Sequence, residues 1–292
     1  MCGRHINTRS AQDLNALYSI VLELWATHEA TVPVAMGHLV HALFLDLVRR
    51  FDAALSKRLH DEPGYRPYTV SPLLGVARQG EEIALRPGQR CYLRVTLLDG
   101  GNLWQSLNSY VLGRWTITVH LGSSDLQLVR LFSASNVDPS GWASTTDWQS
   151  LAAIRAARSI TCLFLSPTAY HLGDREFLLF PEALPLWESL LRVWNRYAPT
   201  NYQMEKQAVR ECVAKSTAVA DCNVSTETLH YPKYTQKGFV GTCTYSIEAK
   251  GKDAQSLAVL AAFAPYSGVG YKTTMAMGQV RTRLSETQVG HT

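Results

Sequence analysis

The sequence predicts an α+β protein, because one order of segments occurs twice along its 292 residues: strand, helix, two strands, helix, strand. A chain of this length can hold two domains of about 100–150 residues each. The strand candidates are short runs rich in β-branched and aromatic residues, and the helix candidates carry apolar residues at helical spacing. We therefore expect two tandem ferredoxin-like (RRM-like) βαββαβ domains with antiparallel sheets and a C-terminal glycine-rich loop.

The first repeat is predicted to fill residues 15–148, after a flexible polar leader at residues 1–14. Its expected strands are 17–25, 66–74, 82–86, 91–98, 115–120 and 126–132, and its expected helices are 37–50, 52–60 and 103–112. Residues 27–36 are expected to form a loop. A stretch rich in Ser, Thr, Pro and Gly, residues 138–150, is predicted to contain the domain boundary.

The second repeat is predicted to fill residues 149–292. Its expected strands are 159–165, one short strand within 218–229, 238–247 and 279–284, and its expected helices are 181–197 and 254–263. Residues 166–170 are expected to form a turn, and residues 199–236 give only weak signals.

Composition excludes several classes of protein. No apolar run reaches about 18 residues and the N-terminus lacks the apolar core of a signal peptide, so we expect a cytoplasmic protein without a membrane span. The six cysteines lack CxxC spacing, which disfavours a zinc site, and without a signal peptide disulfides are disfavoured too. A formal charge of +4 permits a nucleic-acid partner without requiring one.

The glycine-rich stretch near the C-terminus is the strongest single motif. Gly268, Gly270 and Gly278 bracket Lys272, Thr273 and Thr274. Glycine lets backbone N–H groups approach an anion closely, and a lysine with two hydroxyls suits phosphate oxygens. The motif thus predicts a cradle for a polyphosphate or a nucleic-acid backbone, with a plain turn between a helix and a strand as the alternative.

The order of elements around this loop disfavours a mononucleotide site. A helix precedes the loop and a strand follows it, which is the reverse of the Walker A and dinucleotide-binding arrangements. The neighbouring segment is basic, with Arg281 among its cations; the others are Lys250, Lys252, Lys272 and Arg283. We expect a basic face there that favours a nucleic acid, although a solvated basic strand would give the same pattern.

Together with three other stretches, the loop resembles the C-terminal motif of the CRISPR-associated endoribonucleases that process precursor CRISPR RNA (the sixth of the Cas series, in the RAMP superfamily). The other matching stretches are 41–45 with 59–71, 164–170 with 186–195, and 238–245. The resemblance covers about residues 16–285 in the expected order. One departure is Ala276-Met-Gly278, where the family usually has Gly-Met-Gly, because alanine does not freely adopt positive φ.

The resemblance implies a reaction that uses neither a metal nor a cofactor. The ribose 2′-OH attacks the adjacent phosphate and leaves a 2′,3′-cyclic phosphate (or 3′-phosphate) and a 5′-OH, which requires a base, an acid and a cation. The implied partners are CRISPR repeat RNA in precursor transcripts and, as further candidates, effector-complex subunits and a second copy of the chain. A non-catalytic RNA-binding subunit of the same superfamily is the alternative.

The resemblance also singles out His41, His60 and Arg66. His41 lies in the first expected helix, where many bacterial members carry a catalytic histidine, and His60 falls where an archaeal relative has one. Arg66 then matches the archaeal cation, but the archaeal catalytic tyrosine falls on Leu45, which cannot transfer a proton. We therefore expect His41 to be the principal acid or base and His60 the second.

The remaining histidines have no motif support. His38 lies three residues before His41, so the two should be neighbours on one helix surface. His120, His171 and His230 are expected to be structural. Lys272 is expected to track the RNA backbone together with the rest of the glycine-rich loop.

Overall fold

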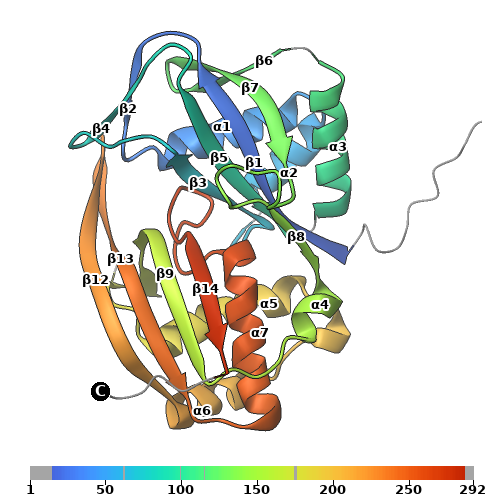
Figure 1. Ribbon diagram of the computed structural model, residues 1–292, viewed down its shortest axis with the longest axis vertical. Coiled ribbons are helices and arrows are strands. Elements are labelled where there is room, and N and C mark those ends of the chain that lie inside the picture. The colour runs from blue at the N-terminus through green and yellow to red at the C-terminus, as the bar shows by residue number, and fades with distance from the viewer. Residues whose placement is uncertain (1–14, 62, 99, 115, 174–175, 287–292) are drawn as a thin grey trace, which may run out of the picture.

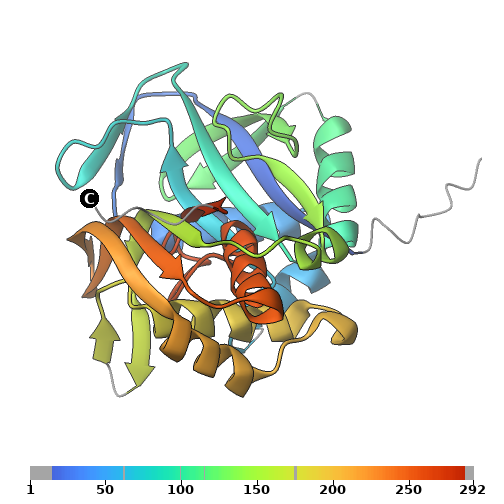
Figure 2. The same ribbon diagram turned by 60° about the horizontal axis from the view of Figure 1, so that its bottom comes forward.

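The chain folds into two halves, each built on an antiparallel sheet, with the N-terminal half above the C-terminal half in Figure 1. The computed structural model describes residues 15–61, 63–98, 100–114, 116–173 and 176–286. The expected leader at residues 1–14 lies outside the described residues. Figure 2 shows that the segment before the last strand runs between the two halves.

The N-terminal sheet has the strand order β3-β5-β1-β7-β6, with β8 pairing to the start of β1. Its strands are β1 (Ala16–Ala26), β3 (Tyr68–Leu74), β5 (Arg90–Leu97), β6 (Ile117–Leu121), β7 (Ser124–Phe132) and β8 (Ser144–Asp147). The helices are α1 (Gly37–Arg49), α2 (Ala53–Asp61) and α3 (Gly100–Leu112). Two short strands, β2 (Ala30–Pro33) and β4 (Glu82–Leu85), form a separate antiparallel ribbon. β2 lies within residues 27–36, which were expected to form a loop, and β4 matches the expected strand 82–86.

The side chains of β1 point alternately to the two faces of this sheet, and they show which face the helices cover. Ile20, Leu22 and Leu24 are fully buried and belong to one core with residues of α1 and α3. Val21 points to the other face, where it packs with Phe132 and Ala143. Successive side chains of a strand point to opposite faces, so this pattern places α1 and α3 on the same side of the sheet.

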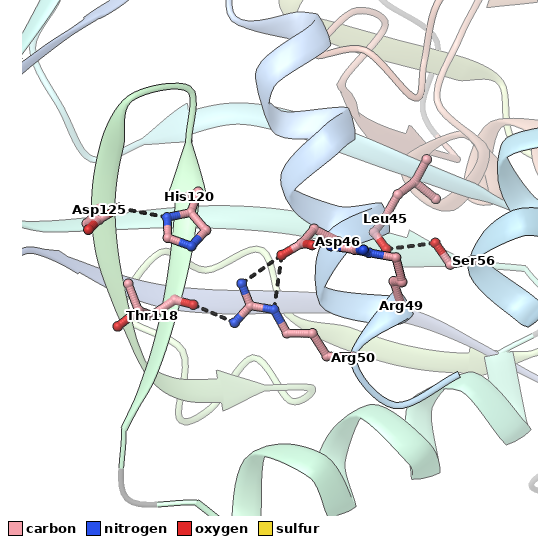
Figure 3. Close-up of polar contacts among 8 residues, drawn as sticks. All are labelled: Leu45, Asp46, Arg49, Arg50, Ser56, Thr118, His120 and Asp125. Carbon is pink, nitrogen blue, oxygen red and sulfur yellow. Dashed lines mark hydrogen bonds and ion pairs between the residues drawn. The ribbon is translucent and has the colours of Figure 1, made fainter. Parts of the chain in front are cut away.

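The C-terminal end of α1 is fastened to the sheet by polar contacts (Figure 3). Arg50 bonds to the Asp46 carboxylate through Nη2, at 2.7 Å, and donates from Nη1 to the Thr118 carbonyl of β6, at 2.6 Å. The Ser56 hydroxyl, at the start of α2, donates to the Leu45 carbonyl at 2.8 Å. These contacts fix the direction of α1, whose first turns carry His38 and His41.

The C-terminal sheet has the strand order β12-β13-β9-β14. Its strands are β9 (Ser159–Thr168), β12 (Thr217–Tyr231), β13 (Tyr234–Ile247) and β14 (Val280–Ser285). The helices are α4 (Trp148–Ala152), α5 (Ala183–Tyr197), α6 (Lys206–Ser216) and α7 (Gly251–Ser267), with a 3-10 turn at Thr200–Tyr202. A hairpin of β10 (Tyr170–Gly173) and β11 (Glu176–Leu178) follows β9. Trp187, Trp194 and Phe263 fill the core between α5 and α7.

Most expected elements are confirmed, and the differences have identifiable causes. The weak region 199–236 contains α6 and a 15-residue strand, β12. As an edge strand, β12 alternates between exposed and half-buried positions and has few apolar residues, which explains its weak signal. The expected turn at 166–170 is wrong, because β9 continues to Thr168 and β10 begins at Tyr170.

The predicted boundary segment, residues 138–150, is not a free linker. Its β8 extends the N-terminal sheet, whereas Trp148 and Leu151 of α4 are buried in the core of the C-terminal half. The chain therefore leaves the N-terminal sheet and enters the C-terminal core within a few residues. The domain boundary near residue 148 stays a prediction.

A buried arginine joins the two halves. Arg94 of β5 is 2% exposed and donates from Nε to the Ser19 hydroxyl and from Nη1 to Gln279 Oε1, both at 2.7 Å. A further N–H of the guanidinium donates to the carbonyl of Pro265 in α7. All three acceptors are neutral, and burial lowers the pKa of Arg94 to about 9. The charge is thus held by hydrogen bonds from both halves instead of by a carboxylate.

Candidate active site at the junction of the two halves

The predicted site residues other than Arg281 meet where α1, the end of α2 and the segment from 268 to 279 come together. A cavity of about 490 Å³ opens beside this segment. Arg66, Lys272, Thr273 and Thr274 are among the residues that line it. The segment itself, here called the glycine loop, connects α7 with β14 as the sequence predicts.

The glycine loop is docked onto β3 of the N-terminal half by backbone hydrogen bonds. The Val70 N–H donates to the Thr273 carbonyl, and the Ala276 N–H donates to the Val70 carbonyl, each at 3.1 Å. Thr274, between them, is buried. The loop therefore belongs structurally to both halves, and its position relative to α1 is fixed.

The glycine N–H groups do not form the expected anion cradle. Gly268, Gly270 and Gly278 donate to the Ala264 carbonyl, the Ser189 hydroxyl and the Pro167 carbonyl, respectively. The glycines are required by packing and backbone conformation instead. A Cβ at Gly270 would lie 2.4 Å from the carbonyl oxygen of Ala169, and all three residues have positive φ. RNA binding by other groups of the loop stays a prediction.

Two non-glycine residues of the loop also adopt positive φ. Lys272 has φ 56° and Ala276 has φ 67°. Alanine does not freely adopt this conformation, and at position 276 it is held there because its N–H donates to the Val70 carbonyl and its methyl group is buried in the N-terminal core. Left-handed backbone costs a non-glycine residue roughly 1–2 kcal/mol, which the docking of the loop offsets.

His41 lies half-buried against the loop. Its Nδ1–H donates to the Thr274 carbonyl at 3.1 Å, and its ring stacks on Tyr68 with centroids 6.1 Å apart. Burial, with smaller electrostatic contributions from Arg66, His60 and His38, lowers the pKa of His41 to about 4 against the opposing effect of the hydrogen bond to the Thr274 carbonyl. His41 is therefore neutral at pH 7, and because Nδ1 carries the hydrogen, Nε2 presents a lone pair.

His60 and Arg66 lie near enough to His41 for their charges to contribute to its lowered pKa. The His60 side chain is 68% exposed, and its Nδ1–H donates to the Asp61 carboxylate at 2.9 Å. Arg66 donates from Nη2 to the backbone carbonyl of His60 at 2.9 Å, and its buried Nε has no partner in the described structure. The structure thus brings the three predicted catalytic residues together.

A second polar cluster, which sequence reasoning missed, lies at the first turn of α1. Tyr234, at the turn between β12 and β13, has its hydroxyl 2.7 Å from His38 Nε2 and 2.9 Å from Lys272 Nζ. The Lys272 ammonium also lies 4.2 Å from the centroid of the Tyr234 ring. Tyr231 stacks on Tyr234 with centroids 4.7 Å apart. We call His38, Tyr231, Tyr234 and Lys272 the tyrosine–lysine cluster.

The sequence carried a partial signal for this cluster. Pro232 and Lys233 separate two strand-like runs, a spacing typical of a hairpin turn. Which helix the turn would reach could not be read from the sequence. Tyr68 was also missed, because its contact with the His41 ring joins residues from different elements. Its buried hydroxyl has no partner in the described structure, and burial raises its pKa.

Arg281 lies apart from these residues. It donates to the carbonyls of Gly141 and Ser140, at 3.0 and 3.4 Å, and its guanidinium stacks over the ring of Trp142 at 4.0 Å. It does not line the cavity. Throughout the described ranges, no three His, Cys, Asp or Glu residues gather as they would around a metal ion. None of the helices described is both long and apolar enough to cross a membrane.

Two family models match successive parts of the chain. The CRISPR Cas6 N-terminal domain matches residues 16–153, and CRISPR-associated endoribonuclease Cas6 matches residues 163–280. The CRISPR-associated endoribonuclease Cas6 of Streptococcus thermophilus is 23% identical over 121 residues, which is 41% of this chain. The match spans 48% of that relative, about half its length.

Solved structures match over nearly the whole chain. A Cas6 of Thermus thermophilus in its product complex is 26% identical with a TM-score of 0.75, covering 91% of this chain and 100% of that one. Another structure of the same protein gives 24% identity and a TM-score of 0.70, covering 92% and 99%. A RAMP protein solved with different RNA substrates, 13% identical with a TM-score of 0.55, covers 91% and 99% and shares the fold alone.

These matches agree with the strand orders of the two sheets and confirm the tandem ferredoxin-like fold. They also agree with the order of the four stretches that carried the resemblance in the sequence. The chain therefore belongs to the family of the CRISPR-associated endoribonuclease Cas6.

Proposed function

We propose that this protein is a metal-independent endoribonuclease that cleaves CRISPR repeat RNA in precursor transcripts to give mature guide RNAs. The observation that carries the proposal is the grouping of His41, His60 and Arg66 beside the glycine loop. These residues supply the three groups that attack by a 2′-OH requires: a base, an acid and a cation. Membership of the Cas6 family and the product complex of a relative support the substrate class.

The environments of the two histidines suggest different roles. His41 is neutral at pH 7 and presents Nε2 as an acceptor, so it takes the proton of the 2′-OH. His60 is exposed and its ring bonds to the Asp61 carboxylate, which orients it, so we assign to it the transfer of a proton to the departing 5′-oxygen. This division keeps both predicted histidines and assigns the base to His41, because a group with a pKa of about 4 carries almost no proton to donate at neutral pH.

Arg66 completes the step. The 2′-oxygen forms a bond to phosphorus while the bond from phosphorus to the 5′-oxygen breaks, leaving a 2′,3′-cyclic phosphate and a 5′-OH. Negative charge builds up on the phosphate oxygens in the transition state, and a guanidinium stabilises it by charge-assisted hydrogen bonds. Arg66 lines the cavity, which suits it to this role.

Lys272 is proposed to hold the RNA backbone, supported by its place on the cavity wall and in the tyrosine–lysine cluster. Thr273 lines the same cavity and offers a hydroxyl to phosphate oxygens. Effector-complex subunits and a second copy of the chain stay predicted partners.

A cleavage assay in EDTA tests the proposal. A CRISPR repeat RNA from the source organism, labelled at its 5′ end, should be cut once per repeat, and mass spectrometry of the fragments should show a cyclic phosphate or 3′-phosphate and a 5′-OH. Tight binding without cutting would instead identify a non-catalytic RNA-binding subunit. Cutting that requires added Mg²⁺ would refute the metal-independent mechanism.

A further inference from the structure

We propose that the cavity beside the catalytic residues binds the base of one unpaired nucleotide, close to the phosphate that is cleaved. This inference rests on the proposed function and names the part of the RNA that the cavity would take. It assigns a binding role to His171, Tyr271, Tyr65 and Arg192, none of which the chemistry of cleavage uses.

One wall of the cavity is an aromatic stack. The ring of His171, from β10, stacks on the ring of Tyr271 in the glycine loop, with centroids 5.5 Å apart and an interplanar angle of 27°. Phe177, from β11, contacts both rings, at 5.0 and 5.3 Å. The Tyr271 N–H donates to the Ala169 carbonyl at 2.9 Å. The exposed His171 ring is therefore held in place by neighbours before any ligand arrives.

Other parts of the cavity wall come from the N-terminal half and from α5. Tyr65, just before Arg66, lies under the guanidinium of Arg192, which is 6.0 Å from the centroid of its ring. The Tyr197 hydroxyl, also from α5, donates to the Tyr65 carbonyl and fixes this backbone. Gly64 and Gly270 line the cavity as well and add no side chain to fill it.

The chemistry of these walls selects the ligand. Arg66, Arg192 and Lys272 line the cavity, and none of the described lining residues is acidic, so a ligand with negative charge is favoured. Histidine and tyrosine rings favour a flat aromatic group, and arginine over an aromatic ring extends such a surface. A nucleotide combines both properties, and a volume of about 490 Å³ is ample for one base.

The base must be unpaired. A base within a helix has both faces stacked on its neighbours, whereas proteins that read single-stranded RNA stack splayed bases on aromatic or arginine side chains. Because Arg66 belongs both to the cavity and to the catalytic group, a nucleotide that fills the cavity has its phosphate near the reacting one. The cavity would thus help to select which phosphate is cut.

Abasic scanning of the repeat RNA tests the inference. Each nucleotide in turn is replaced by an abasic one, and the dissociation constant is measured by fluorescence anisotropy in EDTA for the wild type and for His171→Ala. One position should weaken binding to the wild type by about tenfold, the scale of one base–aromatic stack, and should weaken binding to His171→Ala by less than about twofold. Tyr65→Ala should abolish the same positional effect.

The control is His120→Ala, which removes an exposed histidine whose Nδ1 bonds to Asp125 on the far hairpin of β6 and β7 (Figure 3). It should keep the full abasic effect. Equal abasic effects in the wild type and in both cavity variants would overturn the inference. If the protein cuts the RNA, a 2′-deoxyribose placed before the mapped cut removes the attacking hydroxyl and keeps the RNA intact during the binding measurement. If the protein does not cut, the binding measurement is unaffected. Failure of the cavity and failure of the proposed activity are therefore distinguishable.

Discussion

His38 and Tyr234 are 196 residues apart in the sequence, yet His38 Nε2 and the Tyr234 hydroxyl are 2.7 Å apart. Burial and the charge of Lys272 lower the pKa of His38, so its neutral ring accepts the hydroxyl hydrogen, while the same oxygen accepts a hydrogen bond from Lys272. The tip of the C-terminal hairpin is therefore attached to the first turn of α1, and it holds Lys272, which lines the same cavity as Arg66.

Lys272 and Tyr234 should affect RNA binding in different ways. Lys272→Ala removes one cation, so it should weaken binding to repeat RNA and reduce the slope of log K against log salt by about 0.7–0.9. Tyr234→Phe keeps that charge but frees the ammonium, so it should weaken binding a few-fold without changing the slope. Titrations at several salt concentrations measure both. An unchanged slope for Lys272→Ala would show that this residue does not contact phosphate.

Loss of either histidine should slow cleavage far more than it weakens binding. We expect His60→Ala and His41→Ala each to reduce the single-turnover rate about 10²-fold or more, because each removes one proton-transfer group. The dissociation constant should change by less than about threefold. His230→Ala, an exposed histidine outside the catalytic group, is the matched control. A normal rate for one of the two variants would assign both proton transfers to the other histidine.

The pKa of His41 predicts the acidic side of the pH profile. As a base it must be neutral, and with a pKa of about 4 it stays neutral down to that pH. Protonation of His41 should therefore not slow cleavage between pH 7 and about pH 5. It should slow cleavage only near pH 4. A loss centred near pH 6.5 in wild type, absent from His60→Ala, would contradict this assignment.

The same pKa affects stability. Between about pH 6.5 and about pH 4 the unfolded chain protonates His41 and the folded protein does not, so this residue makes the free energy of unfolding fall as the pH falls. His41→Gln removes that contribution. The decrease in melting temperature from pH 7.5 to pH 5 should then be smaller in the variant than in the wild type, and an equal decrease would refute the lowered pKa.

The glycine loop should tolerate a methyl group very poorly at position 278. A Cβ there would lie 2.2 Å from the carbonyl oxygen of Val269, and the residue has φ 70°. Gly278→Ala should therefore cost about 3 kcal/mol or more of unfolding free energy. Gly251→Ala is the control, because its φ is 58° with no atom within 4 Å of the added methyl, and it should cost only about 1 kcal/mol. Urea unfolding measures both; equal costs would mean that the loop moves freely.

Arg94 should be important for holding the two halves together. Arg94→Met leaves the Gln279 and Pro265 oxygens buried without this donor, at a cost of about 2–4 kcal/mol. Arg49→Met, which removes an arginine that is 67% exposed and paired with Asp46, should cost at most about 1 kcal/mol. A similar melting temperature for the two variants would show that the buried contacts contribute little.

The sequence by itself determined the order of elements and the class of fold. Strands such as β1 and β9 have dense β-branched and aromatic residues, and α5 has a clear apolar face, because these elements form the cores. Motifs that are continuous in the chain, such as the glycine loop, were also recognisable. The polar edge strand β12 was underestimated, because an edge position buries too little to leave a strong pattern.

Only the tertiary structure decided what these motifs do. Hydrogen bonds between residues far apart use the glycine N–H groups for docking, place Tyr234 beside His38 and bury His41 under Thr274. Burial lowers the pKa of His41, and burial is a property of the packed halves and not of the helix that carries the residue. The sequence thus identified the histidines as candidates, and the contact between the two halves determined the burial and the lowered pKa of His41.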